Sequence, residues 1–497
     1  MRARSLRLAG RAAALAAIAI GALALWLICD VGFANYDTLY ALAWGGQLSR
    51  GSTPAYGVAI APTPHPLVEI LGVVLSPLSP HAITNVTVAL GFLALSACGW
   101  VIYRLGAQWF GRAAGLVAAL LFITREPVLS YGVRAYVDLP YLLLVLGALL
   151  VEARHRRAGA PVLALLALAG LLRPEAWAFT GLYWLYLLEL MPAFLRRWTG
   201  EESSAHDAPA WRRRSKTEIA RLTLLAASAP LVWVLSDLAI TGDALWSLTN
   251  TQHTATTLDR ATGIANVPEY IPRRIGEILA PAGLLAAAVG GVLSLLWLRR
   301  RALPGAIAGV VAVIVFAAFA SLGLPINTRY AFLAAAILCV FAGAGVFGWT
   351  RLAREDPHRR WWMGVGAFAL VVLLAYAPSQ YHLVHRELGK LARQQSIEGE
   401  LLALVRDHAI NLRCGPVGVP NHAPIPLLAL YLETSPRNII SAQVGHIRSG
   451  VYVDPASKEV EEHYVLDKND PHEAVSVPPG FSESRTSRSW LIFQRCS

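Results

Sequence analysis

The chain has 497 residues, of which 55% are hydrophobic and only 15% are charged, and its mean hydropathy is +0.48. These values are typical of a membrane protein with many spans and exclude an ordinary soluble enzyme of this length. The net charge of +11 does not indicate a nucleic-acid-binding protein, because the basic residues fall in short groups between apolar runs and form no continuous basic face.

The chain begins with a basic segment that leads into an apolar run at residues 12–28. A secretory signal peptide is one interpretation of such a pattern. The apolar run is longer than that of a signal peptide, and no convincing cleavage site precedes Asp30. We therefore predict a first membrane span that is retained in the mature protein.

Ten further apolar runs follow, and together they predict an α-helical polytopic membrane protein with about eleven transmembrane helices. The runs lie at about residues 82–103, 113–124, 139–152, 160–172, 176–195, 219–240, 276–298, 304–322, 330–350 and 361–378. We assign residues 1–378 to this transmembrane domain. Its long connections are a first outer loop at 30–81, a cytoplasmic loop at 196–218 and a second outer loop at 241–275.

The distribution of basic residues predicts the orientation of the chain. With the N-terminus in the cytoplasm, about 23 of the 43 Lys and Arg residues lie in inner segments, about 8 in outer loops and about 12 in the C-terminal tail. We therefore expect a multi-pass protein of the inner (plasma) membrane with a cytoplasmic N-terminus. The cytoplasmic loop also contains Arg212, Arg213 and Arg214, which suit contact with anionic lipid.

An odd number of spans places residues 379–497 on the outer face of the membrane. Charges of both signs and Pro and Gly turns appear there, so we predict a small extracytoplasmic α/β domain. Its expected elements are an amphipathic helix at 397–409 and short buried strands or helices at 417–419, 427–432, 438–441 and 490–494. Cys414 and Cys496 could form a disulfide in an oxidising compartment.

Asp37 follows the first span directly and precedes an amphipathic segment. A carboxylate next to a bilayer is costly, and residues of this kind often serve a function. The simpler interpretation is that Asp37 caps a helix that begins at Thr38, a common role for Asp. The choice between the two depends on which other polar groups lie at the same face of the membrane.

Polar residues collect at the outer ends of several spans and could line one cavity. The candidates are Asp37, Tyr40 and His65 in the first outer loop, Arg134, Tyr136 and Asp138 before the fourth span, Arg173 and Glu175 between the fifth and sixth, and Arg329 and Tyr330 before the tenth. Simpler interpretations exist for single residues, such as a helix cap for Asp138, a helix-dipole contact for Glu175, a snorkelling side chain for Arg329 and an interfacial side chain for His65.

Taken together, an acidic group near several arginines at one interface suits transfer from a lipid phosphate. The carboxylate of Asp37 would take the proton of an acceptor hydroxyl. The arginines would bind the phosphate and stabilise charge on the leaving group. The apolar spans would supply a groove for the lipid chain, and the outer domain could help to dock the acceptor.

Short motifs in this chain resemble those of the GT-C superfamily of polyprenyl-phosphate-sugar-dependent glycosyltransferases, especially the protein O-mannosyltransferase and aminoarabinose (lipid A) transferase branch. The motifs are Tyr36-Asp37, Gly51–Tyr56, His65–Leu67, Gly106–Gly111, Tyr131–Pro140, Arg173–Glu175 and Arg329-Tyr330. The resemblance covers about residues 10–350, and the outer C-terminal domain in arrangement only.

The resemblance implies a glycosyltransferase in which Asp37 and Asp138 are catalytic and Arg134, Arg173, Arg329 and Tyr330 bind the donor phosphate. The donor would be a sugar on polyprenyl phosphate, and the acceptor a glycan, a glycolipid or a protein. Members of the superfamily differ in their dependence on a divalent cation. Thr38 follows Asp37 where some members have Glu, and no Asp-x-Asp occurs, so we leave the metal unassigned; a divalent cation stays an open alternative, and no other cofactor is expected.

Two other classes of function compete with a transferase. A transporter or lipid-carrier flippase would carry charged residues in mid-membrane, whereas most span interiors here carry none, and no internal repeat is evident. A scaffold that has lost its chemistry would form no product from the donor. Formation of a product from the donor by the purified protein would distinguish an active transferase from both a flippase and a scaffold.

Overall fold

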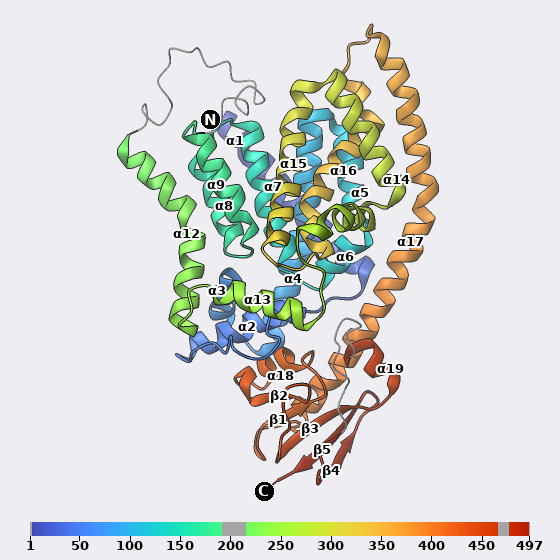
Figure 1. The fold of residues 1–497 in the computed structure, drawn as a ribbon. Helices are drawn as coiled ribbons and strands as arrows, with labels where there is room; N and C mark the ends of the chain where they lie inside the picture. The colour runs from blue at the N-terminus through green and yellow to red at the C-terminus, as the bar shows by residue number, and fades with distance from the viewer. Residues whose placement is uncertain (1, 191–214, 466–476, 497) are drawn as a thin grey trace.

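A computed structural model describes residues 2–190, 215–465 and 477–496 of the chain. Most of the cytoplasmic loop predicted at 196–218, with its three consecutive arginines, lies outside these residues. A bundle of upright helices carries a small sheet domain at one end (Figure 1). The N-terminal end of the first helix and the C-terminal domain lie at opposite ends of the bundle (Figure 1).

The helices of the first half of the chain are α1 (Arg2–Cys29), α2 (Tyr36–Ser49), α3 (Pro66–Leu75), α4 (Pro80–Phe110), α5 (Arg112–Ile123), α6 (Glu126–Val133), α7 (Asp138–Arg154), α8 (Ala160–Gly170) and α9 (Glu175–Leu187). The second half contributes α12 (Lys216–Thr241), α13 (Trp246–Thr257), η1 (Ile264–Asn266), α14 (Val267–Trp297), α15 (Arg299–Ser321), η2 (Thr328–Ala331), α16 (Phe332–Phe347), η3 (Gly348–Arg351) and α17 (Pro357–Arg406).

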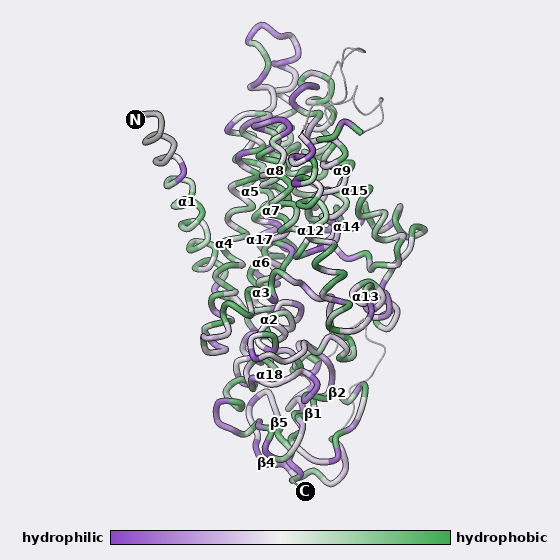
Figure 2. The backbone as a smooth tube through the Cα atoms, turned by 90° about the vertical axis from the view of Figure 1, so that its left-hand side faces the viewer, coloured by the Kyte–Doolittle hydropathy of each residue, from purple (hydrophilic) through white to green (hydrophobic). Residues whose placement is uncertain are grey.

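Each of the eleven predicted apolar runs coincides with one helix of this bundle. Within the described residues, seven helices are long and apolar enough to cross a membrane, and α5 with α6 forms an eighth candidate bent by 65°. The other matching helices, α7, α8 and α9, are shorter than this length test requires. The prediction of a polytopic α-helical membrane protein is confirmed. Figure 2 shows hydrophobic residues along the bundle and hydrophilic residues concentrated towards its ends and in the sheet domain.

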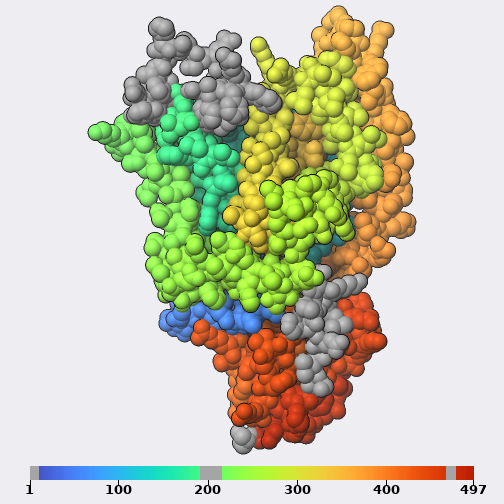
Figure 3. Space-filling model, viewed as in Figure 1, coloured from blue at the N-terminus to red at the C-terminus, as the bar shows by residue number. Residues whose placement is uncertain are grey.

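The loops that the sequence analysis assigned to one side of the membrane do meet at one end of the bundle. Helices α2, α3 and α13 lie between the long helices and the C-terminal domain (Figure 1). Residues of the second outer loop cover the front of this end, directly beside the α2–α3 layer (Figure 3). The candidate residues therefore come from segments that share this end of the molecule.

Two helices are broken close to this end, and one buried arginine contacts both breaks. Arg125 lies at the bend between α5 and α6, and its Nε donates to the Leu121 carbonyl at 3.0 Å. Its Nη1 reaches the Leu279 carbonyl at 3.4 Å, just before Ala280 interrupts α14 with a φ of 56°. The guanidinium thus satisfies carbonyl groups that the interrupted helices leave without their usual donors.

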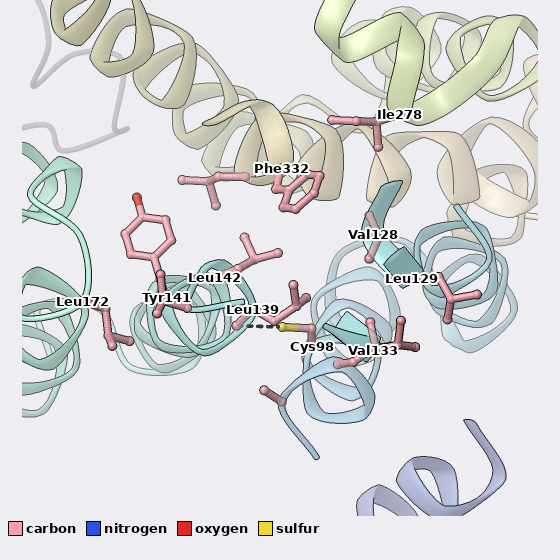
Figure 4. Packing of buried hydrophobic residues seen from close by; sticks show 14 of the residues in the cluster. Cys98, Val128, Leu129, Val133, Leu139, Tyr141, Leu142, Leu172, Ile278 and Phe332 are labelled. Carbon is pink, nitrogen blue, oxygen red and sulfur yellow. Dashed lines mark hydrogen bonds between the residues drawn. The ribbon is translucent and has the colours of Figure 1, made fainter. Parts of the chain in front are cut away.

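The core of the bundle is apolar, and its helices approach closely. Figure 4 shows side chains of α4, α6, α7 and α16 meeting between the helices, among them Leu139, Val133 and Phe332. Helix α14 crosses α16 at glycines, since a Cβ at Gly290 would lie 1.8 Å from the Phe341 carbonyl oxygen. Small residues at such crossings let helix backbones come together in a membrane.

The C-terminal domain is a small α/β unit, as predicted. Its strands are β1 (Val417–Val419), β2 (Ile439–Ser441), β3 (Gly450–Pro455), β4 (Ser482–Thr486) and β5 (Trp490–Arg495), with α18 (Ile425–Tyr431), η4 (Pro436–Asn438), α19 (Lys458–Val460) and η5 (Glu461–Val465) between them. The strand order is β2-β1-β3-β5-β4, with β1 parallel to β2 and β3, and β5 antiparallel to β3 and β4. A disulfide joins Cys414 to Cys496.

The expected elements of this domain match the observed ones at β1, α18, β2 and β5, whereas β3 and β4 were not predicted. The amphipathic helix expected at 397–409 is the end of α17, which continues from the bundle without a break. Strand β4 has all five residues exposed, so it carries no alternation of apolar and polar residues to reveal it.

The crossing of α14 and α16 yields a paired prediction. Gly290→Ala places a methyl group against the α16 backbone and should lower the thermal unfolding temperature of the detergent-solubilised protein, at a cost of roughly 1–3 kcal/mol. Gly291→Ala is the matched control, because its Cβ would meet nothing within 4 Å. Equal unfolding temperatures for the two variants would contradict the close crossing.

Candidate active site

The start of α2 leaves the Asp37 side chain available for other contacts. The N-cap of this helix is Asn35, whose Oδ1 accepts from the backbone N–H groups of Asp37 and Thr38. The interpretation of Asp37 as the cap of a helix beginning at Thr38 is therefore wrong. Because Asn35 performs the capping, the carboxylate of Asp37 in the first turn is directed to a tertiary partner.

That partner is Arg329, which lies in η2 between α15 and α16. Arg329 Nη1 lies 2.6 Å from Asp37 Oδ2, and both side chains are largely buried. The turn is held by Thr328, whose hydroxyl donates to Glu277 at 2.9 Å, and by Arg274, whose Nε donates to the Ile326 carbonyl at 3.3 Å. Arg329 therefore makes a fixed ion pair, in contrast to the snorkelling interpretation.

A second ion-paired group lies beside the first. Arg173 contacts Asp138 through Nη1, and it contacts Glu175 through Nη2 at 2.6 Å and Nε at 3.3 Å. Arg329 Nη1 lies 3.9 Å from Asp138 Oδ2 and so joins the two groups. We call Asp37, Arg329, Asp138, Arg173 and Glu175 the charged network. Asp138 does not act as a helix cap, because its side chain makes no capping hydrogen bond in α7.

Aromatic rings and His65 surround this network. The Tyr330 ring lies 4.3 Å from the Arg173 guanidinium carbon, a cation–π distance. His65 is buried, and its Nδ1 is bonded to the Leu172 carbonyl at 2.7 Å, which makes Nδ1 the protonated nitrogen of a neutral ring. Burial lowers the pKa of His65 to about 4, so the ring stays neutral in the physiological range. Tyr40 lies one turn beyond Asp37, fully buried against the Tyr36 ring.

Arg134 and Tyr136 lie at the edge of the same site. The Arg134 guanidinium packs over the rings of Tyr131 and Tyr136 at 5.2 Å and 4.9 Å, and it donates to Ser130. Arg329 lies 5.9 Å from the Tyr136 ring, which links this edge to the charged network. Among the described residues, Arg134 has no carboxylate within ion-pairing distance.

The sequence analysis missed one arginine of the site. Arg260, in the segment after α13, is close enough to Asp37 to lower its pKa. Backbone hydrogen bonds of neighbouring residues fix this segment, from Gly263 N–H to the Ala320 carbonyl at 2.9 Å and from Ile326 N–H to the Ala261 carbonyl at 2.8 Å. The only signal in the sequence is that Arg260 is the first basic residue after Arg221, in a long outer loop.

The charge on Asp37 follows from these neighbours. Burial raises the pKa of this carboxyl, but Arg329, with His65 and Arg260, outweighs the effect and brings the pKa below its ordinary value. A carboxyl with a lowered folded-state pKa stabilises the fold above its unfolded-state pKa and loses that contribution only as the pH falls through the folded-state value. Asp37 is therefore ionised, and its ion pair intact, throughout the neutral range.

An apolar cleft opens beside the network. Its charged end is formed by Arg173, Glu175, Arg329 and Tyr330, and its walls are Tyr141, Phe179, Ala312, Val315, Phe316, Phe319, Ala320, Leu324, Pro325 and Leu333. The cavity holds about 30 Å³, room for little more than one water molecule.

The carboxylates do not form a metal site within the described part of the chain. No group of three or more His, Cys, Asp or Glu residues is arranged there to hold an ion. Asp37, Asp138 and Glu175 each have an arginine as partner instead. These residues do not fit a divalent cation, and we derive no step that uses one.

The fold of this chain is similar to that of solved membrane transferases. ArnT from Cupriavidus metallidurans, solved bound to undecaprenyl phosphate, matches with a TM-score of 0.57 and 13% identity, over 96% of this chain and 97% of that one. The chain has a GT-C fold. The oligosaccharyltransferase AglB from Archaeoglobus fulgidus, solved with an inhibitory peptide and a dolichol-phosphate, matches with a TM-score of 0.50 and 13% identity, over 90% of this chain and 69% of that one.

At these identities the likeness shows the fold alone. No protein-family model and no curated protein sequence matches the chain. The resemblance drawn from short motifs is thus confirmed at the level of the GT-C fold. Every residue proposed for the site has a defined place around the charged network, and their roles remain proposals.

Because Arg173 pairs with two buried carboxylates, replacing it should lower the stability of the protein strongly. Arg173→Gln leaves the buried Glu175 without its cation and Asp138 with only the Arg329 contact at 3.9 Å, and it should cost about 3–5 kcal/mol, seen as a lower unfolding temperature in detergent. Arg273→Gln is the control, because this arginine is 60% exposed and pairs with Glu277 at 3.3 Å, a contact worth at most about 1 kcal/mol. A similar small shift in both variants would show that the network contributes little.

Proposed function

We propose that this protein is an integral membrane glycosyltransferase that moves a sugar from a polyprenyl-phosphate carrier to an acceptor hydroxyl at the outer face of the membrane. The observation that carries the proposal is the charged network at the head of an apolar cleft, with Asp37 ionised and arginines on several sides. Two proteins with the same fold were solved with lipid phosphates, undecaprenyl phosphate and dolichol-phosphate, which supports a carrier of this chemical class.

In the proposed step Asp37 is the general base. Its carboxylate accepts the proton of the acceptor hydroxyl while that oxygen forms a bond to the anomeric carbon of the sugar. The bond between this carbon and the phosphate oxygen breaks, and its electron pair leaves with the polyprenyl phosphate. Asp138, joined to Arg329 and Arg173, fixes the position of both guanidiniums and is the second catalytic carboxylate.

The cations of the site have different tasks in this proposal. Arg134, Arg329 and Tyr330 bind the donor phosphate, and Arg260 is added to them because its positive charge acts on Asp37 and it has no ion pair among the described residues. Arg173 lines the same cleft and contributes positive charge to phosphate binding while it holds Asp138 and Glu175. His65, Tyr40, Tyr136 and Glu175 complete the walls.

The protein is placed in the plasma membrane with its N-terminus in the cytoplasm and its C-terminal domain outside. The excess of Lys and Arg in the inner segments supports this orientation. The disulfide between Cys414 and Cys496 supports it independently, because disulfides persist in oxidising compartments. The acceptor, a glycan, a glycolipid or a protein, would then reach the site from the outside.

Asp37→Asn tests the chemistry. The amide cannot accept the proton, so turnover of a labelled polyprenyl-phosphate sugar by the purified protein should fall by about 100- to 10,000-fold, while the donor still binds. Asp30→Asn is the control, an exposed aspartate at the start of the same loop. Wild-type turnover in Asp37→Asn would remove the mechanism. Movement of a labelled lipid across vesicles without loss of its sugar would favour a flippase instead.

Labelling of single cysteines tests the orientation. In right-side-out membrane vesicles, a membrane-impermeant maleimide should label Ser482→Cys, in the exposed strand β4, and should leave Arg300→Cys unlabelled until the membrane is permeabilised. The native Cys29, Cys98 and Cys339 are buried and should give little background. The opposite pattern would place the site on the cytoplasmic side.

A further inference from the structure

The C-terminal domain contacts the segment that carries Asp37. His422, between β1 and α18, lies against the Tyr36 ring, with centroids 5.4 Å apart and the planes at 85°. This is the edge-to-face geometry that aromatic rings prefer. Tyr36 is the first residue of α2 and immediately precedes Asp37. One ring from the outer domain therefore packs against the residue that immediately precedes the proposed catalytic carboxylate.

His422 is itself held in place by the sheet. Its backbone N–H donates to Gln443 Oε1 at 3.0 Å, and its Nδ1 lies 3.2 Å from the same oxygen. Gln443 follows β2, and its backbone N–H is bonded to the Ser441 hydroxyl. The two residues thus come from the carboxyl ends of the adjacent parallel strands β1 and β2, the edge at which residues of such sheets commonly serve a site.

Tyr36 transmits this contact to the start of α2. Its hydroxyl donates to the Ile60 carbonyl at 3.1 Å, which holds the far end of the ring, and its other face meets Tyr40 at 5.0 Å. A shift of the Tyr36 ring would move the first turn of α2 and with it the carboxylate that pairs with Arg329. The half-buried Tyr36 side chain is held by both of these contacts.

Other contacts between the domain and the bundle hold different parts of the loop. Gln47, in the last turn of α2, donates to the Ser435 hydroxyl at 3.2 Å, and Thr84 at the start of α4 bonds Tyr431 at 2.9 Å. These contacts attach the domain to the last turn of α2 and to the start of α4, whereas His422 contacts the first residue of α2. Loss of the His422 ring should therefore leave this attachment in place.

We propose that His422 is a positioning residue for the transfer reaction, acting through Tyr36 to hold Asp37 in line with the acceptor hydroxyl. This inference rests on the proposed function of Asp37. It assigns the C-terminal domain a part in building the active site, in addition to any contact that it makes with the acceptor. Because donor phosphate binds to the arginines of the bundle, the effect of His422 falls on turnover and not on donor affinity.

The test compares His422→Ala with His422→Phe in the full-length protein. The alanine variant should lower kcat roughly two- to twelve-fold, the effect of losing one edge-to-face aromatic contact, with the KM values for donor and acceptor unchanged. Phenylalanine keeps an aromatic edge towards Tyr36 and should restore most of kcat. His446→Ala, an exposed histidine of the same domain, is the control and should behave as wild type.

Several outcomes would overturn the positioning role. These are an unchanged kcat in His422→Ala, a failure of His422→Phe to restore it, or an effect confined to the acceptor KM, which would make His422 an acceptor-binding residue. If His422→Ala and His422→Phe both lower the unfolding temperature and reduce kcat to the same extent, His422 has a structural role. If Asp37→Asn is inactive while His422→Ala is fully active, only this inference fails; if Asp37→Asn is active, the proposed function fails.

Discussion

The site depends on the ion pairs between carboxylates and guanidiniums in the charged network. Five ionised groups are buried together at the end of a membrane bundle, where a single unpaired charge would cost several kcal/mol. Each charge has at least one opposite charge as neighbour, and Arg329 joins the two halves. These pairs offset the cost of burying the charges, and Arg173 and Arg329 each lie close to two carboxylates.

The fold brings these groups together from segments far apart in the sequence. Asp37 follows the first span, Asp138 and Arg173 flank α7 and α8, and Arg329 enters between α15 and α16. Two helices of the same bundle are broken, and Arg125 donates to carbonyls at both breaks. Irregular backbone of this kind is tolerated at membrane depth only where other protein groups supply its hydrogen bonds.

The sequence predicted the helices and the meeting of the candidate residues at one end of the bundle, because both follow from hydropathy and from the assignment of loops to one side of the membrane. The sequence did not reveal which side chains contact one another in the site. The capping role of Asn35 and the closeness of Arg260 to Asp37 depend on tertiary packing that no spacing in the sequence reveals. The same holds for Arg173, whose two carboxylate partners lie on either side of it in the fold. Strand β4, exposed throughout, has no apolar pattern to detect.

Charge balance accounts for the pairing of the proposed base with a proposed phosphate-binding arginine. The site holds the carboxylates of Asp37, Asp138 and Glu175 and the guanidiniums of Arg134, Arg173, Arg260 and Arg329, so one positive charge is left over, which suits a singly charged sugar phosphodiester. When the sugar departs, the carrier phosphate gains a second negative charge. In the proposed step Asp37 becomes neutral at that moment and releases Arg329, so the guanidinium is freed when the leaving phosphate most needs it.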